Sequence, residues 1–219
     1  MGNVEEHFIK VERTARYVTA GELCAETPVI WIVFHGYGQL ATNMITNFHT
    51  LADHEHYIIA PEGLSRFYWD GMTGQPGASW MTKEERLHEI EDYTNYLSKL
   101  FHQLHKEFPS NAQINVLGFS QGVATATRWL AHEQLSVARL IIWAGEMPHD
   151  VDYGALAPHL SDTEIYMVLG LRDPFITTDQ MEQQKRFAAN YLSSVETINF
   201  DGTHRLDEDT LLRLAALQD

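Results

Sequence analysis

The chain has 219 residues, 44% of them hydrophobic and 11% aromatic, a composition that suits one folded domain over residues 1–219 and argues against disorder. Its 30 acidic residues outnumber its 15 basic residues, and the formal net charge of −15 disfavours binding to nucleic acid and to anionic membrane surfaces. Its single cysteine, Cys24, excludes an intrachain disulfide and a metal site built from several thiolates.

The chain carries no recognisable membrane or export signal. No uncharged apolar run approaches the roughly 18 residues that a membrane helix needs. The first residues lack the basic and apolar regions of a secretory signal. We therefore expect a cytoplasmic protein with no stable membrane association. The composition leaves the oligomeric state open, a homodimer included.

Apolar runs bounded by turn residues predict the strands. Residues 7–19 alternate as two short strands, which predicts a hairpin at one edge of a sheet. The run 29–34 holds six apolar residues and is followed by glycines, a pattern typical of a strand buried on both faces. Further strands are predicted at 57–60, 114–117, 140–143, 165–169 and 195–200.

Helical periodicity fills the intervals between these strands. The first helix is predicted between Thr82 and Pro109, with Thr82 and Glu85 as a capping box. Helices are also predicted at 121–133, 178–192 and 206–217, the second capped by Thr177 or Thr178 and the third by Asp207 or a neighbour. This alternation predicts an α/β fold with a mostly parallel central sheet, helices on both faces, and ligands at the carboxyl ends of the strands.

The glycine-rich stretch 61–81 fits no helix or strand pattern. Loops of this length are usually functional or disordered. Its tryptophans, Phe67 and Tyr68 favour an ordered wall or flap over a pocket.

One short motif predicts a nucleophile. Gly118-Phe119-Ser120-Gln121-Gly122 follows the strand 114–117 directly and precedes a helix, the setting of a G-x-S-x-G nucleophile elbow. The glycines are needed because Cβ atoms there would collide with the neighbouring strand and helix. The helix N-terminus would place N–H groups beside the oxyanion that forms when Ser120 attacks a carbonyl.

A nucleophilic serine requires a histidine as base and a carboxylate to orient it. In a chain with this order of strands and helices, the acid follows the serine and the histidine follows the acid. His204 lies after the last strand and before the last helix, whereas His132, His149 and His159 come too early or lie within a helix. Asp173 follows the penultimate strand and would hold the tautomer of His204.

The loop after the strand 29–34 is expected to complete an oxyanion hole. In His35-Gly36-Tyr37-Gly38, the Tyr37 backbone N–H is the predicted partner of the Gln121 backbone N–H. His35 itself is expected to support this loop from beneath rather than to act in catalysis.

With these motifs placed, the chain resembles the phospholipase/carboxylesterase branch of the α/β hydrolases. The resemblance spans roughly residues 29–217 and rests on His35-Gly36-Tyr37-Gly38, Ala60-Pro61-Glu62-Gly63, Ser79-Trp80, Gly118-Phe119-Ser120-Gln121-Gly122, Asp173-Pro174 and Gly202-Thr203-His204. It implies an α/β-hydrolase fold, with Ser120, Asp173 and His204 as the triad and the Tyr37 and Gln121 amides as the oxyanion hole. The short intervals between core elements leave no room for a large cap domain.

The expected activity is hydrolysis of carboxylic esters with small to medium acyl groups, without metal or organic cofactor. Gln39 stands where thioesterase relatives carry Asp, which favours generic ester hydrolysis over depalmitoylation of proteins. The candidate acyl-pocket residues are Trp69, Trp80, Met147 and Phe175.

Three alternatives remain. The same triad would serve a thioesterase or a lysophospholipase, and a hydrolase fold can also bind a ligand without turnover. A metallohydrolase is the weakest alternative, because His54-Glu55-His56 lacks the helical His-x-x-x-His spacing.

Overall fold

The structure is a computed structural model that describes residues 3–192 and 194–217. Its centre is a seven-stranded sheet in the order β1-β3-β2-β6-β7-β8-β9. All neighbouring strands in this sheet are parallel, except that β1 pairs antiparallel with β3. The strands are β1 (Tyr17–Ala20), β2 (Val29–Phe34), β3 (His56–Pro61), β6 (Gln113–Phe119), β7 (Arg139–Trp143), β8 (Glu164–Gly170) and β9 (Glu196–Phe200).

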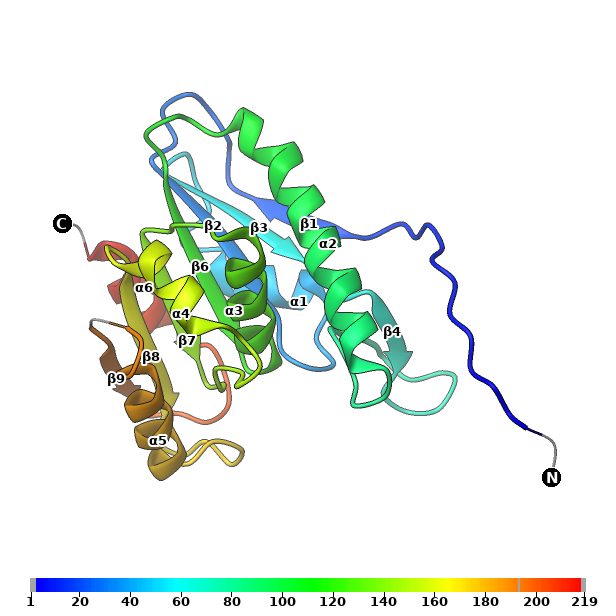
Figure 1. The fold of residues 1–219 in the computed structure, drawn as a ribbon. Helices are drawn as coiled ribbons and strands as arrows, with labels where there is room; N and C mark the ends of the chain where they lie inside the picture. Colours follow the sequence, from blue (N-terminus) through cyan, green and yellow to red (C-terminus); the bar gives the residue numbers. More distant parts are fainter. Residues whose placement is uncertain (1–2, 193, 218–219) are drawn as a thin grey trace.

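Helices cover both faces of this sheet (Figure 1). They are α1 (Ala41–Ile45), α2 (Arg86–Leu104), α3 (Gln121–Glu133), α4 (Tyr153–Leu156), α5 (Thr178–Ala188) and α6 (Glu208–Ala216). One core lies between the sheet and α2 to α5, and the second lies between the sheet and α1 and α6. Strand β2 shows why its sequence is uniformly apolar: Ile30 and Ile32 enter the first core, and Trp31 enters the second. The predicted layered α/β architecture is confirmed.

The predicted N-terminal hairpin is wrong. Residues 3–16 form no regular strand, and only β1 joins the sheet, at its edge beside β3. Figure 1 shows this N-terminal segment running past α2 and away from the sheet. Its apolar side chains Val4, Phe8, Ile9 and Val11 are all exposed. The alternating apolar residues therefore have no buried face to occupy. Because no second strand pairs with this segment, it does not form a strand.

The helix boundaries are partly as predicted. Thr177 caps α5 in a capping box with Gln180, and Asp207 caps α6, as expected. The Thr82–Glu85 capping box is wrong, because α2 begins at Arg86 and Glu85 adopts a left-handed conformation. The Glu89 carboxylate, one turn into the helix, accepts hydrogen bonds from the backbone and hydroxyl of Thr82 instead. Helix α5 ends at Ala188, four residues before its predicted end.

The stretch 61–81 contains a second, two-stranded sheet. Strand β4 (Ser65–Tyr68) pairs antiparallel with β5 (Pro76–Ser79), and the two form a hairpin. Within the described residues the chain adds no cap domain to the core fold. The expected ordered wall is therefore this hairpin, and it lies beside the loop that follows β2.

Candidate functional site

Ser120 occupies a sharp turn between β6 and α3. Its backbone has φ 53° and ψ −117°, a strained conformation for a residue with a side chain. A Cβ atom at Gly122 would lie 2.2 Å from the Phe34 carbonyl oxygen, and one at Gly118 would lie 2.5 Å from Val123 Cα. Neither contact is sterically allowed. The turn therefore has the geometry of a nucleophile elbow, and the reason given for its glycines is confirmed.

Asp173 and His204 lie in contact beyond the carboxyl ends of β8 and β9. Their Nδ1 and Oδ2 atoms are 2.7 Å apart. The Asp173 side chain is fully buried, and its Oδ1 accepts the backbone N–H groups of Phe175 at 2.8 Å and Ile176 at 3.0 Å. With the carboxylate accepting from Nδ1–H, the Nε2 atom of His204 is left as the acceptor that a general base requires.

The imidazole of His204 lies beside the nucleophile elbow. The ring of Phe119, the residue before Ser120, has its centroid 4.9 Å from that of His204, and Phe175 contacts the imidazole edge-on at the same distance. Among the side chains that the structure describes, no hydrogen bond joins Ser120 to His204. In α/β hydrolases such a bond often tightens only when substrate binds, and the proton transfer between these two residues stays a prediction.

The loop 36–39 presents one free amide. The Gly36 N–H donates to Gln39 Oε1 at 2.8 Å, and the Gly38 N–H donates to the Ala78 carbonyl at 2.8 Å. The Gln39 N–H donates to the Gly36 carbonyl at 3.2 Å. The Tyr37 N–H alone has no acceptor within the described part of the chain.

This loop lies against the elbow. A Cβ atom at Gly36 would lie 3.2 Å from Ser120 Cβ. On the elbow, the Ser120 N–H is bound to the Trp143 carbonyl at 2.9 Å, whereas the Gln121 N–H, in the first turn of α3, finds no acceptor among the described residues. The two amides predicted for the oxyanion hole are thus unpaired, and their segments are adjacent.

His35 supports the loop from beneath, as expected. Its Nδ1 lies 2.8 Å from the Gly36 carbonyl, and its Nε2 accepts the Gly63 N–H at 2.9 Å. The ring stacks on Trp80, whose indole N–H donates to the His35 carbonyl at 2.9 Å. Burial lowers the pKa of His35 to about 4, and the neutral ring suits the bond from Gly63, because a protonated Nε2 could not accept it.

The side chain of Gln121 ties the elbow to the end of the β4–β5 hairpin. Its Nε2 donates to the Met81 carbonyl at 2.8 Å, and its Oε1 accepts the Trp80 N–H at 3.1 Å. From the sequence, only a backbone role is predicted for Gln121. Its side-chain contacts could not be anticipated, since they depend on where the stretch 61–81 folds back.

The four candidate pocket residues fall into two groups. Trp69 and Phe175 are 57% and 69% exposed at the rim of the site. Trp80 and Met147 are 2% and 1% exposed and belong to the core between the sheet and α2 to α5, and their place on an acyl-pocket wall stays a prediction. The aromatic character of a loop does not reveal which of its rings face inward.

Tyr37 and Phe67 were not predicted as side chains of the site. Their rings stack at 5.2 Å, and each contacts Trp69, at 5.7 Å and 5.6 Å. We call these three rings the aromatic cluster. The only sequence signal for it was the aromatic content of the stretch 61–81.

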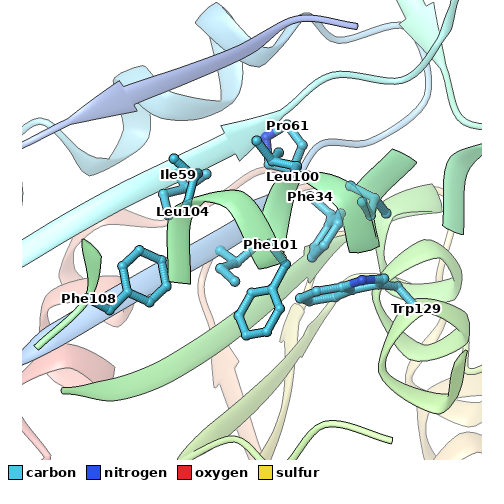
Figure 2. A pocket seen from close by; sticks show the side chains of 10 residues that line it. Phe34, Ile59, Pro61, Leu100, Phe101, Leu104, Phe108 and Trp129 are labelled. Carbon is cyan, nitrogen blue, oxygen red and sulfur yellow. The ribbon is translucent and has the colours of Figure 1, made fainter. Parts of the chain in front are cut away.

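Two cavities lie away from this site. A small apolar cavity of about 10 Å³ lies between the sheet, α2 and Trp129 (Figure 2). It is too small for a substrate, since a single water needs about that volume. A groove of about 850 Å³ runs between the N-terminal segment and α2, and its lining includes Trp80 but not Ser120, Asp173 or His204.

His56, one of the residues weighed as a metal ligand, has another partner. Its Nδ1 lies 3.2 Å from the indole nitrogen of Trp31, which donates to it. No cluster of three or more ligand-type side chains is found in the part of the chain that the structure describes. No helix among the described residues is long and apolar enough to span a membrane.

The sheet order, the elbow and the edge on which Ser120, Asp173 and His204 lie define an α/β-hydrolase fold. A family model described as Phospholipase/Carboxylesterase matches residues 18–216. The chain therefore belongs to the phospholipase/carboxylesterase family, and the family resemblance inferred from the sequence is confirmed. None of the curated protein sequences matches the chain.

Solved structures share the fold at low sequence identity. Acyl-protein thioesterase 2 of Zea mays is 16% identical, with a TM-score of 0.69 over 92% of this chain and 96% of that one. A carboxylesterase from Mesorhizobium loti is 14% identical, with a TM-score of 0.69 over 92% and 95%. The Bacillus cereus carboxylesterase is 16% identical, with a TM-score of 0.65 over 91% of each chain.

Proposed function

We propose that this hydrolase cleaves carboxylic esters of small to medium acyl groups through an acyl intermediate on Ser120. The observation that carries the proposal is the 2.7 Å contact between Asp173 and His204, placed beside a strained serine and two unpaired amides. Ser120 Oγ attacks the ester carbonyl while His204 Nε2 takes its proton, and the tetrahedral oxyanion receives the Tyr37 and Gln121 N–H groups. The leaving alcohol then takes that proton.

The second half of the reaction uses the same groups. Water enters, His204 Nε2 takes one of its protons, and the oxygen attacks the acyl carbonyl. The bond from the acyl carbon to Ser120 Oγ then breaks, Oγ takes the proton from His204 Nε2, and the carboxylic acid leaves. Asp173 stays ionised throughout and stabilises the imidazolium. The chemistry needs no electron acceptor and no group outside the chain, the ester and water.

Covalent labelling and turnover test the proposal together. A fluorophosphonate probe is expected to modify the wild type at Ser120, which peptide mass spectrometry locates, and to leave Ser120→Ala unmodified. His204→Ala is expected to lose roughly 1000-fold or more in kcat on p-nitrophenyl esters. His132→Ala is the matched control, because His132 also follows the serine in the chain but lies exposed on α3. A fully active His204→Ala protein would refute the mechanism.

A substrate panel separates esterase from thioesterase and lysophospholipase activity on the same triad. The fold shared with a structure named as an acyl-protein thioesterase makes a thioester the natural competitor. Comparing kcat/KM for p-nitrophenyl esters of increasing acyl length, an acyl-CoA and a lysophospholipid decides between them. We expect the short and medium esters to be preferred, and a clear preference for the lysophospholipid or the thioester would overturn this substrate assignment.

A further inference from the structure

The β4–β5 hairpin is hydrogen-bonded to the loop that carries the Tyr37 amide. The Gly38 N–H donates to the Ala78 carbonyl at 2.8 Å, and the Ala78 N–H donates to the Gln39 carbonyl at 3.3 Å. These two hydrogen bonds attach residues 38–39 to β5. The loop therefore takes part of its shape from the hairpin.

Trp69, directly after β4, adds a side-chain bond to the same loop. Its indole Nε1–H donates to the Gly38 carbonyl at 2.9 Å. Gly38 has φ 74°, and a Cβ atom there would lie 1.9 Å from Trp69 Cζ2, so the indole fills the space over this glycine. Tyr37 and Phe67 contact the same ring in the aromatic cluster.

The Gly38 carbonyl is linked to the Tyr37 amide through two peptide planes. The peptide that carries the Gly38 carbonyl also carries the Gln39 N–H, which donates to the Gly36 carbonyl. The peptide that carries the Gly36 carbonyl also carries the Tyr37 N–H. Because a trans peptide holds its C=O and N–H in one plane on opposite sides, fixing the Gly36 carbonyl fixes the direction of the Tyr37 N–H.

We infer that Trp69 is a positioning residue for the oxyanion hole, an inference that rests on the proposed function. The indole N–H holds the Gly38–Gln39 peptide. That peptide holds the Gly36 carbonyl together with His35 Nδ1, and the Tyr37 N–H is thereby aimed toward the carbonyl oxygen above Ser120. Trp69 touches none of the reacting atoms in this arrangement. Its hydrogen bond stabilises the transition state indirectly, through the Tyr37 N–H.

Trp69→Phe tests the inference because it keeps an aromatic ring but removes the indole donor, together with part of the ring that covers Gly38. One hydrogen bond is worth about a tenfold change in rate, so kcat is expected to fall roughly tenfold with little change in KM. The diagnostic readout is the ratio of kcat/KM for an ester to that for the matching thionoester, whose sulfur is the poorer acceptor of N–H bonds. This ratio is expected to fall several-fold in Trp69→Phe. Tyr68→Ala, which removes a 54% exposed neighbour on the hairpin, is expected to leave the ratio unchanged.

A second variant reaches the same bond from the other strand. In Gly77→Ala the new methyl group would lie 2.5 Å from the Gly38 carbonyl oxygen and 2.9 Å from Trp69 Nε1, so that it separates the two atoms. The ester-to-thionoester ratio is expected to fall here as well, which keeps the test decisive even where Trp69→Phe folds poorly.

The outcomes separate the inference from the proposed function. Variants that are labelled by the fluorophosphonate probe and keep the wild-type ratio overturn the inference alone. Equal losses on both substrates also overturn it, because they indicate a structural role only. A wild type that neither hydrolyses esters nor takes the label overturns the proposed function and the inference with it.

Discussion

At the scale of single residues, Asp173 is held more tightly than the other residues of the site. Its buried carboxylate accepts three N–H groups, from His204, Phe175 and Ile176. Two of the three come from the chain immediately after it, so the turn and the carboxylate fix one another. The His204 tautomer therefore depends on the turn formed by residues 173–176.

Asp173→Asn is expected to lower kcat by roughly 1000-fold to 10,000-fold while leaving the fold intact. An amide nitrogen placed at Oδ2 would donate to His204 Nδ1, and the ring would then carry its proton on Nε2, where it cannot act as a base. Steady-state kinetics on p-nitrophenyl esters measure the loss, and circular dichroism reports the fold.

The control for this variant lies on the neighbouring loop. Asp201 is exposed and pairs with Arg172, so that Asp201→Asn removes a carboxylate close in sequence to His204 without touching the imidazole. It is expected to keep wild-type kcat. An Asp173→Asn protein within threefold of wild-type kcat contradicts the assigned role.

The residues of the site differ in how far the sequence could reveal them. Ser120, Asp173 and His204 stand out because each follows a predicted strand at its carboxyl end, and parallel strands bring those ends to one edge. The inward position of Trp80 and the outward position of Trp69 depend on how the β4–β5 hairpin packs. No local pattern in the glycine-rich stretch encodes that packing.

At the scale of elements, Glu62 joins three segments at the end of β3. Its carboxylate is 1% exposed and accepts from Arg16 before β1, from Arg66 on β4 and from the Ala41 N–H at the start of α1. Burial alone would raise the pKa of Glu62, but the bonds from Arg16, Ala41 and Arg66 outweigh it and lower the pKa. The charge is therefore retained inside the fold by its partners.

Glu62→Gln is expected to lower the free energy of unfolding by about 2 kcal/mol, since two charged hydrogen bonds weaken while both arginines stay half exposed to water. Urea denaturation followed by circular dichroism measures the change. Glu91→Gln is the matched control, because Glu91 pairs with Lys10 on the surface. The urea midpoint of this variant is expected to stay at the wild-type value. Equal midpoints for the two variants would contradict the role of Glu62.

The predicted elements succeeded where burial on two faces leaves an unambiguous pattern, as in β2 and β6. They failed where a pattern needs a partner from elsewhere. The alternation in residues 7–19 finds no second strand, so only β1 pairs. Helix α2 starts later than predicted because the Glu89 carboxylate, which lies within the helix, accepts the backbone N–H of Thr82. This bond competes with the predicted capping box between Thr82 and Glu85.

At the scale of the whole molecule, burial of His35 couples stability to pH. Its pKa is about 4 in the folded chain, against 6.5 for an unburied imidazole. Above pH 6.5 both states are neutral, and the group adds no pH dependence. Between pH 6.5 and 4 the imidazole is protonated in the unfolded chain but not in the folded chain, so stability falls as the pH falls. Below pH 4 the imidazole is protonated in both states. The total loss is about 3 kcal/mol.

His35→Gln is expected to flatten this part of the stability profile, because an amide can still donate and accept hydrogen bonds but does not titrate. The variant loses stability at pH 7 through imperfect contacts with Gly36 and Gly63, yet its free energy of unfolding changes less between pH 6.5 and 4 than that of the wild type. Urea denaturation at half-unit pH steps measures both slopes. His132→Gln, which removes an exposed imidazole, provides the comparison. If the free energy of unfolding of His35→Gln falls with pH as steeply as that of the wild type and of His132→Gln, the buried imidazole is not the source of the pH dependence.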